Sequence, residues 1–267
     1  MSTVEAGYDP TFLGPRVPLP VPAQTVRVLP STHFTVLLDP ERRLAAATGV
    51  NIDGAQLVDL ERGDDWHLDP RVPADEQAGP ELYVRNDLDR GHLVRRRDPV
   101  WGDLVVARRA NFDTFAYPNA APQASAFNQG ELLWVGLEDH VLGYARANAR
   151  RLSVFTGPVL ADDDPVYRGI GIPRLFWKVA AWASAERELR ATAFVLDQSS
   201  LVVGIQVADE VPPLGPYRTF QVPVADVEGL TGLDLGPLVD ADVLAPVGAQ
   251  GDRERWVPLT ALEEMTL

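Results

Sequence analysis

Residues 89–92 read Asp-Arg-Gly-His, residues 119–123 read Asn-Ala-Ala-Pro-Gln, and residues 128–130 read Asn-Gln-Gly. These three stretches place an imidazole, a guanidinium and several amides in one short segment of the chain. Hydrolysis of a phosphodiester needs a neutral base to activate water, cations to hold the phosphate and a ligand for a divalent metal ion. The concentration of these side-chain types therefore predicts a metal-assisted nuclease.

The surroundings of His92 favour a catalytic interpretation. Gly91 lets the backbone approach a ligand closely, and Arg90 lies two positions before His92, on the same face if the segment is a strand. Asn128 precedes a long helical pattern, where one amide can serve both as N-cap and as a hard oxygen ligand for magnesium. The other histidines lack such neighbours and are interpreted as structural or exposed: His33, His67 and His140.

Composition limits the classes of protein that the chain can form. With 267 residues, 46% hydrophobic and 23% charged, it is expected to be a globular protein with a full core. The absence of cysteine excludes disulfides, thiolate metal sites and a cysteine nucleophile. The net charge of −14 opposes nucleic-acid binding, but residues 85–109 carry seven arginines against four acids. Arginine binds phosphate with a planar fork of N–H groups. This local excess of arginine is therefore compatible with a nucleic-acid substrate.

The N-terminal sequence and the hydropathy suggest a location. Residues 1–10 lack the basic start and apolar run of a secretory signal. No stretch reaches the roughly 20 apolar residues of a membrane span. We therefore expect a cytoplasmic protein by default, with a delivered effector as the alternative, no membrane partner, and a monomer or homodimer.

The order of hydrophobic patterns predicts a single mixed α+β domain over residues 31–267, built on an antiparallel or mixed sheet. Residues 1–30 are proline-rich and are expected to form an extended arm over the surface or a linker. Strands are predicted at residues 33–39, 44–52, 114–117, 152–155, 175–183, 191–196 and 217–222. Helices are predicted at residues 100–111, 130–151 and 224–231, the last of them ending at Gly232.

The motifs, taken in order, resemble those of the DNA/RNA non-specific endonucleases, which have a ββα-metal active site. The resemblance rests on the three stretches quoted above and extends over residues 33–233. Further residues that carry it are Arg62, Trp66, Asp69-Pro70, Trp134, Leu137-Glu138, Phe155-Thr156-Gly157-Pro158, Ile172-Pro173, Phe176-Trp177-Lys178, Val227-Glu228 and Thr231-Gly232-Leu233. The implied fold is a ββα-metal nuclease domain with a mixed or antiparallel central sheet packed with helices.

The resemblance implies roles for four residues around the phosphate. His92 would be the general base, and Asn128 would be the one direct protein ligand of a hydrated Mg²⁺, for which Mn²⁺ could substitute. Arg90 and Arg62 would bind the phosphate or stabilise the charge of its transition state.

Two further roles follow from the resemblance. Asn119 would help to position the base or the scissile phosphate. Glu138 would hold the water shell of the metal from a helix. Two more residues separate Gln129-Gly130 from Trp134 than is common in the family, so Glu131 is the alternative to Glu138 in this role.

The implied activity is hydrolysis of internal phosphodiesters in DNA and RNA with little sequence preference and 5′-phosphate products. One alternative is a catalytically silent nuclease fold that binds nucleic acid or a nucleotide. Another is a toxin or defence nuclease that an inhibitor or activator protein controls, with residues 1–30 as a candidate contact.

Three other features have simpler interpretations. Residues 162–164, three consecutive aspartates before a proline, are expected to form a solvated turn. The arginines at 95–97 are either an exposed run or a contact to the substrate backbone. The six tryptophans are expected in the core.

Overall fold

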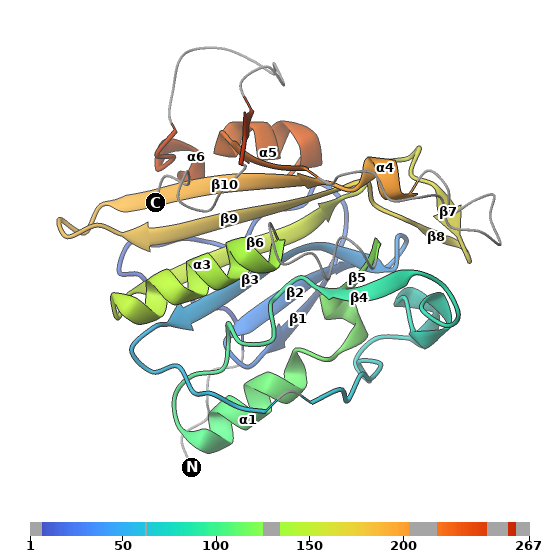
Figure 1. Cartoon of the computed structure of the whole chain (residues 1–267), viewed down its shortest axis with the longest axis horizontal. Coiled ribbons are helices and arrows are strands. Elements are labelled where there is room, and N and C mark those ends of the chain that lie inside the picture. The colour runs from blue at the N-terminus through green and yellow to red at the C-terminus, as the bar shows by residue number, and fades with distance from the viewer. Residues whose placement is uncertain (1–6, 62, 125–133, 203–217, 245–255, 260–267) are drawn as a thin grey trace.

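The computed structural model describes residues 7–61, 63–124, 134–202, 218–244 and 256–259, except for the side chains of 134–140 and 218. Within these residues the chain forms one eight-stranded sheet in which every neighbouring pair of strands is antiparallel (Figure 1). In spatial order the strands are β1 (Arg27–Ser31), β2 (Phe34–Asp39), β3 (Leu44–Asp53), β6 (Arg151–Val159), β9 (Leu175–Ala183), β10 (Leu189–Asp197), β11 (Arg218–Val222) and β12 (Val257–Pro258). The antiparallel alternative is therefore the one that forms.

The first face of the sheet is covered by helix α3 (Trp134–Ala147) (Figure 1). Val141 and Ala145 of this helix are buried in a core that also contains Val94, which follows the Asp-Arg-Gly-His stretch. Because both sheet faces are covered, β2 and β3 are buried along their whole length and their sequences are largely apolar.

The second face is covered by residues 7–26, by α5 (Val224–Thr231) and by α6 (Pro237–Asp240). Tyr8 and Val17 are buried in this second core, and the Tyr8 hydroxyl donates to the Val17 carbonyl at 2.9 Å. The described part of the proline-rich arm thus packs on the sheet and continues into β1.

Two helix ends follow from local chemistry. The N–H of Gly232 donates to the Glu228 carbonyl at 2.8 Å, and Gly232 ends α5 with a left-handed φ of 68°. The carboxylate of Asp103 accepts hydrogen bonds at the start of α1 (Leu104–Asp113). The predicted end of α5 is confirmed, and α1 lies a few residues after its predicted start. Another short helix is α4 (Ser199–Val202), and no helix in the described ranges is long and apolar enough to cross a bilayer.

The Asp-Arg-Gly-His stretch forms a strand that lies outside the main sheet. This strand, β4 (Leu88–His92), pairs antiparallel with β5 (Ala120–Ala124), and α3 follows them along the chain (Figure 1). Strands β7 (Val166–Tyr167) and β8 (Ile170–Gly171) form another small pair. Two strands followed by a helix is the order that a ββα site requires.

The strand predicted at residues 114–117 is wrong. These residues make a turn that leads into a 3-10 helix, Tyr117–Asn119, in which Pro118 supplies a helical φ and no N–H group. The strand of this region is instead β5, which the sequence did not predict because alanine and proline have low strand propensity.

Candidate active site

The register of the β4–β5 pair places Arg90 and His92 side by side on one face. Arg90 lies opposite Pro122 and His92 opposite Ala120, while Asp89 lies opposite Gln123. Successive side chains of a strand alternate between faces, so Arg90 and His92 share a face and Gln123 lies on the other. Both Arg90 and His92 are half-buried, and the Nε2 atom of the His92 imidazole is itself buried.

Two aromatic rings pack beside Arg90 and His92. The Trp66 ring centroid lies 4.7 Å from that of His92, and the Arg90 Cζ lies 5.2 Å from the Trp66 ring. Phe115 packs edge-on against both rings, at 5.2 Å from His92 and 5.4 Å from Trp66. The cation and the imidazole are therefore held against one indole, and rotation of the imidazole is restricted by two rings.

The loop that carries Trp66 is fixed by backbone hydrogen bonds. The N–H of His67 donates to the Phe115 carbonyl at 3.1 Å, and the N–H of Tyr117 donates to the His67 carbonyl at 2.9 Å. These bonds make a short parallel bridge between the loop and the segment before β5. The loop is thereby tied to the segment that leads into β5.

Asn119 braces the chain immediately after His92. Its side-chain oxygen accepts from the Val94 N–H at 2.9 Å, and its amide nitrogen donates to the carbonyls of Val94 at 2.9 Å and Thr114 at 3.0 Å. The main-chain carbonyl of Asn119 also accepts from the Leu93 N–H at 2.9 Å. Asn119 is fully buried, so these contacts suit positioning of the base, the first of its two expected roles.

The opposite face of β4 is closed by Gln123. A Cβ placed on Gly91 would lie 2.1 Å from the Gln123 Cδ, so the glycine is required where the two strands meet. Gln123 is fully buried, yet within the described residues neither its amide nitrogen nor its amide oxygen has a hydrogen-bond partner. Burial of an amide without hydrogen-bond partners is energetically costly.

Gln198 holds β5 from the other side. Its amide nitrogen donates to the carbonyls of Pro122 at 3.3 Å and Pro173 at 2.6 Å, and its oxygen accepts from the Ala124 N–H at 3.0 Å. The residue is fully buried. This link fixes the β4–β5 pair to the loop that precedes β9 in the main sheet.

The charges near the site are of both signs. Arg90 has a long ion pair of 3.9 Å with the exposed carboxylate of Asp64. In the run at 95–97, Arg96 donates to the Asn111 side chain at 3.0 Å and Arg97 pairs with Asp59 at 2.7 Å. An exposed ion pair at this distance contributes little to stability. The pairing with Asp64 therefore leaves Arg90 available to bind a phosphate.

Burial raises the pKa of the Tyr83 phenol well above its usual range, and the neighbouring Tyr117 acts in the same direction. The two rings stack with centroids 6.1 Å apart, at an interplanar angle of 21°. Tyr83 is therefore a neutral group beside the strand pair at physiological pH.

Other predicted site residues cannot be placed in this way. Asn128, Arg62 and Glu131 lie outside the described residues, and Glu138 lies in α3 with its side chain undescribed. Among described residues no group of three or more His, Asp or Glu side chains is arranged to hold a metal ion. The predicted donor set, Asn128 with Glu138 or Glu131, consists of hard oxygen ligands, which fit a hydrated divalent cation.

Trp66 and Gln123 are site residues whose contacts the sequence did not predict. Trp66 was expected in the core, but it is half-buried and contacts the candidate base. The segment around Trp66 is part of the family resemblance, so the sequence did contain a signal that Trp66 lies near the site. Gln123 ends the stretch at residues 119–123, and the sequence alone indicates no separate role for it.

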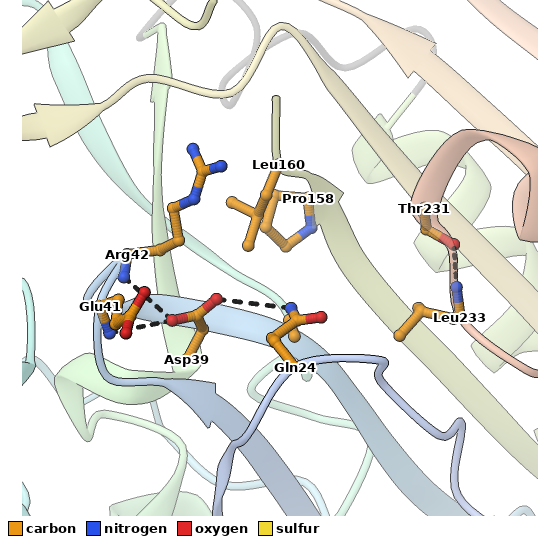
Figure 2. A pocket seen from close by; sticks show the side chains of 9 residues that line it. Gln24, Asp39, Glu41, Arg42, Pro158, Leu160, Thr231 and Leu233 are labelled. Carbon is orange, nitrogen blue, oxygen red and sulfur yellow. Dashed lines mark hydrogen bonds between the residues drawn. The ribbon is translucent and has the colours of Figure 1, made fainter. Parts of the chain in front are cut away.

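A separate cavity of about 280 Å³ lies away from the strand pair (Figure 2). Figure 2 shows Asp39 accepting hydrogen bonds from the turn after β2 and Gln24 reaching the same carboxylate. The Arg42 guanidinium bonds the Ala161 carbonyl at 2.9 Å and pairs with Asp162 in the acidic turn. The acidic stretch is confirmed as a turn, but only Asp162 and Asp163 are solvated, since Asp164 is buried. The cavity contains none of the motif residues.

Comparison with solved structures defines the class of fold. A crystal structure of the EndoG/EndoGI complex that addresses the mechanism of EndoG inhibition matches with a TM-score of 0.58 and 23% identity. The match covers 77% of this chain and 84% of that chain. At this identity the likeness shows the fold alone, and the expected ββα-metal nuclease fold in a single α+β domain is confirmed.

Residues 16–242 match the family described as DNA/RNA non-specific endonuclease. The chain belongs to this family, whose members generally depend on a divalent metal ion. This membership confirms the resemblance that the motifs indicated.

Two relatives indicate the range of the family. The uncharacterized protein y4fB of Sinorhizobium fredii is 42% identical over a 255-residue alignment, which covers 85% of this chain and 38% of y4fB. Mitochondrial endonuclease G of Bos taurus is 28% identical over a 197-residue alignment, which covers 69% of this chain and 58% of that protein. The chain thus spans less than two thirds of the length of either relative.

Proposed function

We propose that this chain is a divalent-metal-dependent endonuclease that hydrolyses phosphodiester bonds in both DNA and RNA. The observation that carries the proposal is the placement of Arg90 and His92 on one face of β4 against Trp66, in a member of a nuclease family. A cation and an imidazole held this close can act on the same phosphate.

His92 acts as the general base and takes a proton from the attacking water. Arg90 binds a non-bridging phosphate oxygen and offsets the charge that builds up as the water attacks. Trp66 and Phe115 keep the imidazole in place, and Asn119 fixes the backbone that leaves β4. Each residue therefore has a role that its described contacts allow.

We propose Mg²⁺ as the metal, with Mn²⁺ as a substitute and Asn128 as its direct ligand. When bound, such an ion would polarise the phosphate and take up charge on the leaving oxygen. Glu138 or, as the alternative, Glu131 would hold the water shell of the ion. Arg62 is assigned to the phosphate alongside Arg90.

Release of the 3′ oxygen as leaving group gives 5′-phosphate products. The described contacts offer no reader of base edges near His92, so we expect little sequence preference and no need for the ribose 2′-hydroxyl. These properties suit a substrate range that includes both nucleic acids.

We also propose control by an inhibitor or activator protein. The EndoG/EndoGI structure is a complex concerned with EndoG inhibition, so a protein of this fold is known in an inhibited state. A cytoplasmic nuclease, or one delivered to a target cell, would need such restraint. Either a monomer or a homodimer is compatible with this role.

Cleavage of supercoiled plasmid and of a labelled single-stranded RNA tests the proposal. With Mg²⁺ we expect both to be cut, with products that a 5′-phosphate-dependent exonuclease degrades. EDTA should abolish both reactions, and added Mg²⁺ should restore them. A chain that cuts neither substrate but still binds them would instead be a silent binding module, and EDTA-resistant cutting would refute the metal assignment.

A further inference from the structure

The outward face of α1 combines an aromatic ring with two cations. Val105, Arg108, Arg109 and Phe112 are spaced so that they share one side of the helix. All four are exposed; 78% of Val105 and 42% of Phe112 are accessible to solvent. The carboxylate of Asp113 is buried at the end of the helix, where Arg109 pairs with it at 2.8 Å.

The Phe112 ring is already organised for stacking. It lies parallel to the His67 ring, with centroids 4.4 Å apart and an interplanar angle of 11°. The Arg109 Cζ lies 5.7 Å from the Phe112 centroid. Phe112 is exposed and His67 is half-buried, and the Arg109 guanidinium lies over the Phe112 ring. An exposed aromatic ring with cations beside it is the arrangement on which proteins stack unpaired bases.

This surface is continuous with the candidate active site. His67 directly follows Trp66, whose ring contacts His92 at 4.7 Å. The N–H of His67 donates to the carbonyl of Phe115, which also packs on His92. Figure 1 shows α1 outside the main sheet, and its contact with His67 joins it to the loop beside the β4–β5 pair.

We propose that His67, Arg108, Arg109 and Phe112, called here the α1 platform, bind the single-stranded stretch of nucleic acid that flanks the scissile phosphate. The inference rests on the proposed function. A base stacks on Phe112, while Arg108 and Arg109 bind phosphates of the same strand. Charge complementarity selects a polyanion as the occupant, since the exposed face of this helix carries two cations and no acid.

Duplex bases are stacked on each other and cannot stack on Phe112. The platform therefore favours single strands, or duplex ends and openings, over intact duplex. A dinucleotide cut at His92 is too short to use the platform. The contribution of the platform should thus appear only with longer strands.

The test compares Phe112→Ala, Phe112→Trp and Arg108→Ala with the parent. Binding of a labelled single-stranded 20-mer is measured by anisotropy in EDTA over a range of salt concentrations. In Mg²⁺, KM is measured for the 20-mer and for a dinucleotide. Two controls lie elsewhere: Arg190→Ala in β10 removes one charge, and Val166→Ala in β7 truncates an exposed apolar side chain.

We expect Phe112→Ala to weaken 20-mer binding about tenfold, as loss of one stacked base would. Phe112→Trp should restore it. Arg108→Ala should reduce the slope of log K against log salt by about 0.7, the value for one phosphate contact on a single strand. The KM for the 20-mer should rise relative to the KM for the dinucleotide, and both controls should match the parent.

Unchanged 20-mer binding in Phe112→Ala and Arg108→Ala would overturn the platform while leaving the proposed function intact, and would favour a protein partner for this surface. Binding of the 20-mer that depends on Phe112 without any cleavage in Mg²⁺ would support the platform and refute the nuclease. A parent that fails to bind the 20-mer would refute both. An equal loss in Phe112→Ala and Phe112→Trp, with lowered melting temperatures, would also overturn the stacking role.

Discussion

Gly91 and Gln123 lie so close together across the β4–β5 pair that a Cβ on Gly91 would come within 2.1 Å of the Gln123 Cδ. The glycine next to the candidate base is therefore required by packing against a buried amide. The contact packs the Gln123 side chain against the backbone of β4 between Arg90 and His92.

Gly91→Ala should separate the strands and lower both stability and activity. Because Gln123 is fully buried and cannot swing aside, we expect a loss of about 1–3 kcal/mol in the free energy of unfolding. The double variant Gly91→Ala with Gln123→Ala should recover most of that stability. Urea denaturation of the four proteins of this cycle measures the coupling.

Gly143→Ala in α3 is the matched control for that cycle, because an added Cβ meets nothing within 4 Å there. It should leave activity unchanged and raise stability by about 0.5–1 kcal/mol. If the two single variants at Gly91 and Gln123 proved additive, the close contact would have no energetic importance.

Asn119→Ala should destabilise the protein and slow catalysis together. It removes three buried hydrogen bonds and leaves the N–H of Val94 and the carbonyls of Val94 and Thr114 without partners, at a cost of roughly 3 kcal/mol. Asn148→Ala, at the exposed end of α3, should cost far less. Equal losses in the two variants, measured by thermal melting, would contradict the bracing role.

The folding stability should depend on pH through His33. Burial lowers the pKa of His33, although its hydrogen bond to the Pro99 carbonyl opposes this. The unfolded chain therefore takes up the proton first, so the free energy of unfolding should fall as the pH drops below about 6.5 toward the folded pKa.

His33→Asn tests this effect, because asparagine tolerates the left-handed φ of 68° at that position. The variant should be less stable at pH 7, since it loses the ring stacked on Trp101 at 3.4 Å. Its stability should change less than that of the parent between pH 6.5 and pH 5. An unchanged slope would mean that another group titrates there.

Trp66→Ala should reduce kcat more than it raises KM. The indole contacts both His92 and Arg90, so its loss frees the base to rotate and the cation to pair with Asp64. Trp66→Phe should retain most of the rate, because a smaller ring still fills part of the site. A rise in KM alone would indicate that Trp66 binds substrate and does not position the base.

Much of the fold could be predicted because its elements have strong local signals. Strand β9 was predicted with its observed bounds, and α5 was predicted with its glycine end. Strand β5 could not be predicted from its own residues, since Ala120–Ala124 forms a strand through its pairing with β4. Such pairing depends on contacts between distant parts of the chain, which no local pattern encodes.

The candidate site was predictable only where a motif is contiguous. The pairing of Arg90 with His92 follows from strand alternation, and the structure bears out that geometry. The contact of Trp66 with His92 joins residues far apart in sequence, and so does the bond from Gln198 to Pro122. These supporting contacts became visible only with the fold.

The most direct test of the central claim is the single-turnover rate of plasmid cleavage by His92→Ala at saturating Mg²⁺, with and without added imidazole. Loss of a general base should lower the rate by about 10²–10⁴-fold, with the melting temperature near that of the parent. Imidazole should restore part of the rate as a substitute base. A folded His92→Ala variant that cleaves within a few-fold of the parental rate would contradict the account.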